Sequence, residues 1–206
     1  MRLADIHTLP DDTLRRIQRI QVVTIVWMSI EAAVSLSAAW IARSPALLAF
    51  GGDSGIELLS AVVVVWQFSA PVGNRQAKTR AARVAGALLF ALAAYVTVVS
   101  ALTLLGRNEP KPTYLGLGIL VAAAAIMPWL ANEKRKLSAA TDSAALRADA
   151  AQSGLCAYLS LIALVGLGVN AIWHVAWADP VAALTVTPLI LWEGKEAIRG
   201  KACGCC

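Results

Sequence analysis

The chain has 206 residues, of which 58% are hydrophobic and only 15% charged, and its mean hydropathy is +0.65. These values lie outside the range of soluble globular domains, so we expect an integral membrane protein in a lipid bilayer. The net charge of +5 does not indicate a nucleic-acid partner, because the basic residues lie in short clusters between apolar runs.

The first 21 residues form a polar segment of mixed charge. They lack the short apolar run and cleavage site of a signal peptide, so we expect the first membrane span to be retained. Leu14, Ile17 and Ile20 fall on one face and several arginines on the other. This pattern is typical of a helix on an anionic membrane surface, and residues 1–21 are predicted to be a cytoplasmic amphipathic segment.

Six apolar runs follow, each about the 20 residues that a helix needs to cross the hydrocarbon of a bilayer. They cover residues 22–42, 46–68, 84–105, 114–130, 148–169 and 180–198. Short polar breaks separate them, at residues 43–45, 71–80, 107–112, 132–143 and 170–179. The predicted fold is therefore all-α: a six-transmembrane-helix bundle over residues 22–198, followed by a cysteine-rich tail over residues 199–206.

The basic residues predict the orientation of this bundle. Fifteen of the eighteen lie before the first run, between runs two and three, between runs four and five, or at the end of the chain from Lys195 on. The other three, Arg43, Arg107 and Lys111, lie on the opposite side. The positive-inside rule makes the first side cytoplasmic. We expect a multi-pass protein of a bacterial cytoplasmic (inner) membrane with both termini in the cytoplasm.

Asp53 and Glu57 lie inside the second apolar run, beside three glycines. A carboxylate at that depth costs at least about 2–3 kcal/mol, so two on one helix need something that offsets them. Their spacing of four residues places both on one helix face, where their oxygens can converge on a cation. The alternative is a pair of protonated acids that bond neighbouring helices, and we favour the cation.

The fifth run carries a second polar face, formed by Asp149, Gln152 and Cys156. A thiolate is a soft ligand for zinc or copper(I), a carboxylate is harder, and an amide carbonyl is a weak ligand. Taken singly, each residue also has an ordinary structural explanation. At about 1.5 Å per residue, Cys156 falls nearer the cytoplasm than Glu57. The two motifs meet only if the fifth helix starts earlier or tilts.

Two further groups are candidate ligands. Glu31 lies near the middle of the first run and is either a ligand, a proton carrier or a hydrogen-bonded neutral acid. Cys203, Cys205 and Cys206 gather in the tail, where cytoplasmic thiols stay reduced and three of them can hold one soft ion. Palmitoylation of the tail is the alternative.

These motifs resemble the transmembrane portion of the cation diffusion facilitator family of six-helix metal transporters. Gly52, Asp53, Ser54 and Glu57 resemble the family's second-helix motif. Ala148 to Ala150 resembles the start of its fifth helix, and residues 178–184 resemble the start of its sixth. The resemblance implies that Asp53 and Glu57 are metal ligands. Gln152 and Cys156 stand where the family usually has histidine and aspartate, which leaves room for a softer or larger cation than zinc.

A second departure from the family is that only residues 199–206 follow the sixth run, where members commonly carry a metal-binding cytoplasmic domain. A homodimer is therefore expected to rest on membrane helices, through small residues of the third run: Gly86, Ala87, Ala91 and Ala94.

The predicted function is secondary transport, not enzymatic catalysis, and no cofactor is expected. The cargo is a divalent transition or heavy-metal ion such as zinc or cadmium, moved outward in exchange for protons. The first alternative is a non-transporting membrane protein that binds or senses metal through its tail. The second is an exporter of organic cations, which would not need Cys156.

Overall fold

The computed structural model describes residues 11–69, 75–107, 109–111, 113–141 and 144–199. Within these residues the secondary structure is six helices and no strand. The helices are α1 (Asp11–Ala42), α2 (Pro45–Ser69), α3 (Arg75–Leu104), α4 (Tyr114–Thr141), α5 (Ala144–Trp173) and α6 (Ala178–Ile198). The predicted all-α bundle of six helices is confirmed.

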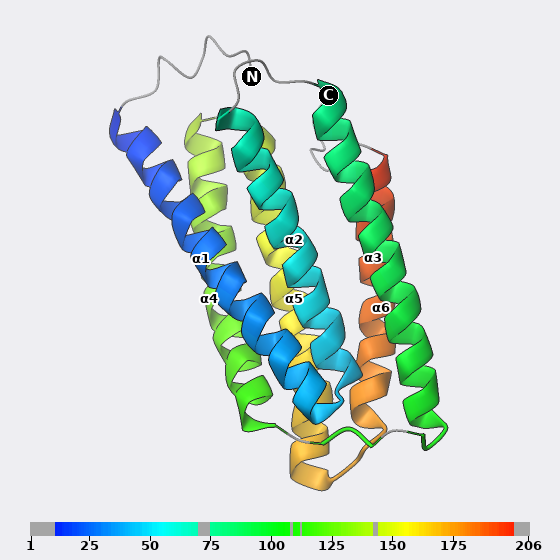
Figure 1. Cartoon of the computed structure of the whole chain (residues 1–206). Coiled ribbons are helices and arrows are strands. Elements are labelled where there is room, and N and C mark those ends of the chain that lie inside the picture. The colour runs from blue at the N-terminus through cyan, green and yellow to red at the C-terminus, as the bar shows by residue number, and fades with distance from the viewer. Residues whose placement is uncertain (1–10, 70–74, 108, 112, 142–143, 200–206) are drawn as a thin grey trace.

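The helices run roughly side by side along one long axis, and successive helices alternate in direction (Figure 1). α2 is central, since it contacts α1, α3, α5 and α6, while α4 packs on α1 and α5. The start of α1 and the end of α6 lie at the same end of the bundle, which we call the terminal end (Figure 1). An even number of helices brings the chain back to this end.

The helices extend beyond the predicted apolar runs. α4 reaches Thr141, and α5 already begins at Ala144, so most of the predicted break at residues 132–143 is helical. Residues 11–21 likewise continue into the first span as part of α1. Charged side chains interrupt an apolar run, but the helix can continue through them, because Lys, Arg and Glu are good helix formers. The predicted break at residues 132–143 was therefore too long.

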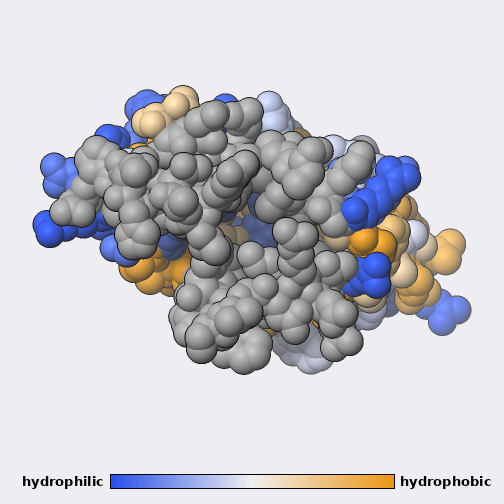
Figure 2. All heavy atoms as spheres, turned by 90° about the horizontal axis from the view of Figure 1, so that it is seen from above, coloured by the Kyte–Doolittle hydropathy of each residue, from blue (hydrophilic) through white to orange (hydrophobic). Residues whose placement is uncertain are grey.

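Four helical segments within the described residues are long and apolar enough to cross a membrane by length and composition. They are Arg15–Ala42, Arg83–Leu104, Tyr114–Ala140 and Asp149–Trp173. Apolar side chains also cover the outside of the bundle, and Trp40, Trp129, Trp173, Trp177 and Trp192 are all exposed. Figure 2 looks down on the terminal end and shows hydrophilic residues at its outer edges and hydrophobic residues on its flanks. This distribution suits a lipid-facing bundle with polar ends.

The start of α2 is held by two side-chain caps. Ser44 precedes Pro45, the first helical residue, and its Oγ accepts a hydrogen bond from the Leu47 backbone N–H at 3.1 Å. Asp179 of α6 accepts a second bond from the Ala46 N–H at 2.9 Å. Two of the free N–H groups at this helix start are thus satisfied. The second bond also fixes α6 beside α2.

α3 and α6 approach closely through glycine. A Cβ added at Gly86 would lie 2.7 Å from the Gly194 carbonyl oxygen and 2.6 Å from Ile198 Cγ1. Gly86 was predicted to be available for a dimer contact, but in this structure it is buried against α6 of the same chain. Ala87, Ala91 and Ala94 remain on the exposed face of α3.

Candidate metal centre

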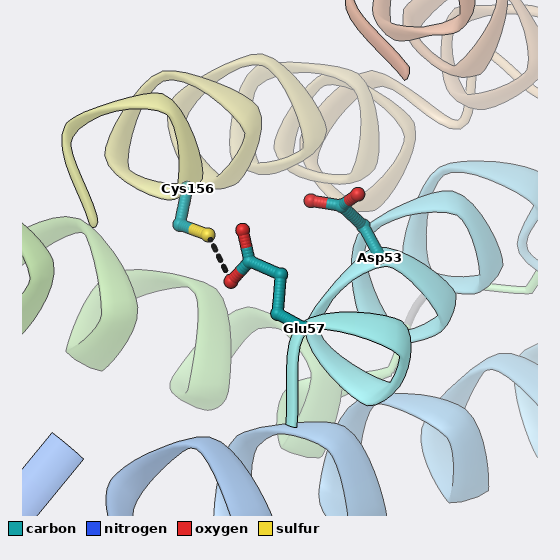
Figure 3. Close-up of side chains that lie close together, drawn as sticks. All are labelled: Asp53, Glu57 and Cys156. Carbon is teal, nitrogen blue, oxygen red and sulfur yellow. Dashed lines mark hydrogen bonds between the residues drawn. The ribbon is translucent and has the colours of Figure 1, made fainter. Parts of the chain in front are cut away.

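Asp53 and Glu57 on α2 and Cys156 on α5 form one group. Each offers one ligand atom, and these atoms all lie within 4.8 Å of one another. The three side chains point into the same space between α2 and α5 (Figure 3). On α2 the spacing of four residues stacks the two carboxyl groups on the face that packs on α5. Two oxygens and one sulfur at this separation can converge on a single metal ion.

Asp53 is the most unusual member of this group. Only 1% of the residue is exposed, and neither carboxyl oxygen has a hydrogen-bond partner. A buried carboxyl group without partners is strongly unfavourable, because it loses its hydration and gains nothing in return. Within the described residues, no Lys or Arg forms an ion pair with it either. A carboxyl group in this arrangement suits the binding of a cation.

Glu57 is half-buried and is held from α5. The Cys156 thiol donates a hydrogen bond to Glu57 Oε2 at 3.0 Å, and Gln152 Nε2 donates to Oε1. The sequence left open whether Cys156 lies at the same depth in the membrane as Glu57. The hydrogen bond between them shows that it does, and α5 begins earlier than expected, at Ala144. The structure therefore brings together four of the predicted ligands: Asp53, Glu57, Gln152 and Cys156.

Cys156 is 1% exposed and packs in an apolar cluster with Met28 of α1 and Met127 and Leu130 of α4. The surroundings of the thiol, apart from Glu57, are thus apolar or sulfur-containing, which suits a soft cation on this side of the group.

Glu31 lies next to this group but outside it. The residue is fully buried, and each oxygen accepts a hydrogen bond, from Ser54 Oγ at 2.6 Å and from Trp27 Nε1 at 2.7 Å. Glu31 is therefore a satisfied buried acid whose partner Ser54 follows Asp53 directly in the sequence. Both oxygens of Glu31 act as acceptors here, and its roles as ligand, proton carrier or hydrogen-bonded neutral acid stay predictions.

Asp149 was predicted as a ligand, but the structure places it in a different network. Its Oδ1 pairs with Lys134 Nζ at 2.9 Å, and its Oδ2 accepts a bond from Gln21 Nε2 at 2.7 Å. Lys134 also donates to Ser153 Oγ at 2.9 Å, and its side chain is 0% exposed. This network joins α1, α4 and α5 and occupies both oxygens of Asp149. Asp149 therefore does not belong to the group around Asp53.

The other predicted ligands, Cys203, Cys205 and Cys206, lie outside the described residues.

One neighbouring acid was missed by the sequence analysis. Glu193 of α6 is half-buried, and its carboxyl group is a near neighbour of that of Asp53. A signal was present in the sequence. Glu193 follows Ile190 by three residues and so continues an apolar helix face, here the buried face of α6. Because Glu193 lies near the charged end of the sixth run, it resembles the solvated charges there.

The electrostatics of the group favour a bound cation. The ligand oxygens of Asp53 and Glu57 lie within 4.8 Å of each other, and two ionised carboxylates at about that separation repel each other by roughly 3–4 kcal/mol at an effective dielectric constant of about 20. A divalent ion between them reverses the sign of this interaction. Carboxylates and a thiolate together form a ligand set for transition metals. Six helices with an apolar outside define the class: an integral membrane protein, here with Asp53, Glu57 and Cys156 gathered between its helices.

The comparison with known families agrees with this class. A family model described as "Cation efflux transmembrane domain" matches residues 22–200. The chain belongs to this family of transporters.

Two curated proteins are similar to the chain. An uncharacterized transporter, sll1263, of Synechocystis is 27% identical over 175 residues, which cover 81% of this chain and 56% of that protein. The manganese efflux system protein MneS of Bacillus subtilis is 23% identical over 188 residues, which cover 87% of this chain and 64% of that protein. The chain thus spans less than two thirds of the length of either relative.

Proposed function

We propose that this protein is a secondary transporter that moves a divalent transition or heavy-metal ion through the group formed by Asp53, Glu57 and Cys156. One observation carries the proposal. Both oxygens of the buried Asp53 lack a partner, and two further ligand atoms lie within 4.8 Å. A group with this much unmet charge and hydrogen-bonding capacity is expected to bind a cation in part of its working cycle.

The proposed cargo is zinc, cadmium or a similar soft ion. Cys156 supports this choice, because a thiolate between Met28 and Met127 is a soft ligand in a sulfur-rich setting. Manganese is the second candidate. It is supported by the similarity to the manganese efflux system protein MneS and by the carboxylates, since oxygen ligands suit manganese.

Proton exchange and outward transport complete the proposal. The Cys156 thiol donates a hydrogen bond to Glu57 Oε2, and metal ligands of these types must lose their protons on binding. Binding of the ion is therefore coupled to proton release at the same atoms. Outward transport is supported by the family description and by the name of MneS.

The proposed arrangement in the membrane follows the sequence analysis: an amphipathic segment over residues 1–21, a transmembrane domain over residues 22–198, and a tail over residues 199–206, with both termini in the cytoplasm of a bacterium. The position of the start of α1 and the end of α6 at one end of the bundle supports this arrangement. A homodimer through the exposed alanines of α3 is also part of the proposal: Ala87, Ala91 and Ala94.

The deciding experiment is metal flux into sealed proteoliposomes with an internal metal indicator. Asp53→Asn and Glu57→Gln remove one charge each at nearly constant shape, and we expect both to abolish flux while the protein still inserts and folds. Glu109→Gln is the matched control, because Glu109 is exposed in the connection between α3 and α4. Unchanged flux in Asp53→Asn would contradict the proposal. Metal binding without any flux in the parent protein would favour the non-transporting sensor instead.

A further inference from the structure

Glu193 brings a third carboxyl group to Asp53 from a different helix. It lies on α6, whose contact with α2 sets it beside Asp53. Ile190, one turn earlier, is fully buried, so Glu193 continues the inward face of α6. Within the described residues, Glu193 pairs with no Lys or Arg, whereas Glu196 pairs with Arg199 at 4.0 Å. Glu193 therefore lies near another acid and has no basic side chain in the described part of the chain to balance its charge.

Close backbone packing determines where Glu193 points. A Cβ added at Gly194 would lie 3.2 Å from the Gly86 carbonyl oxygen, so the backbones of α3 and α6 nearly touch at the next residue. One residue turns an α-helix by about 100°. With Gly194 against α3, Glu193 lies on a neighbouring face of α6, where it interacts with Asp53 of α2. The hydrogen bond between Asp179 and Ala46 holds the other end of α6 against α2.

Asp53 supplies the second, independent observation. The residue is 1% exposed, and its two oxygens have no donor. The nearest hydroxyl in the sequence, that of Ser54, donates to Glu31 instead. Nothing in the described protein therefore bridges the carboxyl groups of Asp53 and Glu193. The most effective bridge between two such groups is a cation, because it satisfies both oxygens and both charges at once.

We propose that Glu193 is a further ligand of the transported cation and sets its preference between oxygen-loving and sulfur-loving ions, an inference that rests on the transport function proposed above. With Glu193, the site offers three carboxylates, from α2 and α6, and one thiolate from α5. Manganese(II) takes carboxylate oxygens, while cadmium and zinc gain more from the thiolate. Glu193 thus contributes mainly to manganese binding, and Cys156 mainly to cadmium binding.

The test measures binding of Mn²⁺ and Cd²⁺ to the purified full-length chain in lipid nanodiscs. Glu193→Gln keeps the size of the side chain but removes its charge. We expect Mn²⁺ affinity to fall by about tenfold or more, the size of loss typical when a group that supports a metal is removed. Cd²⁺ affinity should fall much less, so the Mn²⁺-to-Cd²⁺ preference should drop. Glu196→Gln, on the same helix, is the matched control and should leave both affinities unchanged.

Glu193→Asp gives a second measurement, because it keeps the carboxylate and shortens the side chain by one methylene. Its Mn²⁺-to-Cd²⁺ preference should lie between those of the parent and Glu193→Gln. A preference equal to the parent's in both variants would overturn the role of Glu193 and leave the transport proposal intact. A parent protein that binds neither ion would overturn the proposed function and this inference together. A ligand role predicts the change in preference, whereas a purely structural role would lower the affinities for both ions alike.

Discussion

At the scale of single residues, the buried acids of this protein differ in their hydrogen-bond and ion-pair partners. Glu31 has a donor for each oxygen, and Asp149 has a lysine and a glutamine. Asp53 has neither. Because a satisfied acid is already stabilised, only the unsatisfied one gains fully from a bound cation. The number of partners, and not burial alone, therefore marks Asp53 as the centre of the proposed site.

The first prediction concerns Cys156 and Gln152, which contact the same carboxyl group of Glu57. Gln152→His with Cys156→Asp replaces a weak and a soft ligand by two ligands that suit zinc. We expect the preference for zinc over cadmium to rise by about tenfold, equivalent to about 1.4 kcal/mol. Competition between the two ions during proteoliposome flux measures it. An unchanged order of metals would show that Cys156 is not a ligand.

The second prediction concerns the ion pair between Lys134 and Asp149. The Lys134 side chain is 0% exposed, while that of Asp149 is 32% exposed. Removing the acid leaves a fully buried charge without a partner, so Asp149→Ala should cost about 3 kcal/mol of unfolding free energy. Lys134→Met leaves an acid that can still reach water and should cost much less. Denaturant unfolding in detergent measures both.

Glu133→Gln is the control for this pair, because Glu133 bridges Arg16 and Lys136, whose side chains are each 59% exposed. Only a small change is expected there. Equal losses for Asp149→Ala and Lys134→Met would contradict the asymmetry.

At the scale of elements, the site depends on how α2, α5 and α6 are held together. α2 presents the two acids on one face, α5 supplies Gln152 and Cys156, and α6 brings Glu193. The connection between α2 and α6 is made at their starts by Asp179. A change at this connection should therefore act on the site at a distance.

The third prediction tests this connection. Asp179→Ala removes the acceptor for the Ala46 N–H, and loss of such a cap costs about 1–2 kcal/mol. Asp179→Asn keeps an acceptor oxygen and should retain most of that stability. Thermal unfolding of the purified variants measures the difference. If the alanine variant is as stable as the parent, the bond between α6 and α2 contributes nothing to the fold.

At the scale of the whole molecule, the six helices place the start of α1 and the end of α6 at one end. The basic residues predict that this end faces the cytoplasm. The connections that hold Arg43, Arg107 and Lys111 join helices at the other end. Of the proposed metal centre, Asp53 and Cys156 are each 1% exposed, while Glu57 is half-buried. If the chain transports metal as proposed, these side chains must open toward each side of the membrane in turn.

The fourth prediction tests the orientation. In a background without the native cysteines, Arg107→Cys and Arg199→Cys each place one thiol on an exposed residue at opposite ends of the bundle. A membrane-impermeant thiol reagent added to intact bacteria should label position 107 only. Position 199 should react only after the membrane is opened. The reverse pattern would show that the positive-inside assignment is wrong.

The amino-acid sequence by itself determined the class of fold and part of the site. Hydropathy is a local property, so the six apolar runs predicted six helices, and a spacing of four residues placed Asp53 and Glu57 on one face. Helix ends were less predictable, because charged residues that end a membrane span can continue a helix, as between α4 and α5.

Only the tertiary structure decided which side chains meet. The level of Cys156 relative to Glu57 depends on where α5 starts and how it packs. The engagement of Asp149 by Lys134 and the approach of Glu193 to Asp53 join residues from different helices. Such contacts depend on helix rotation and depth, which are set by side-chain packing and close glycine contacts such as that of Gly86 with Gly194. The periodicity of a single helix carries no information about them.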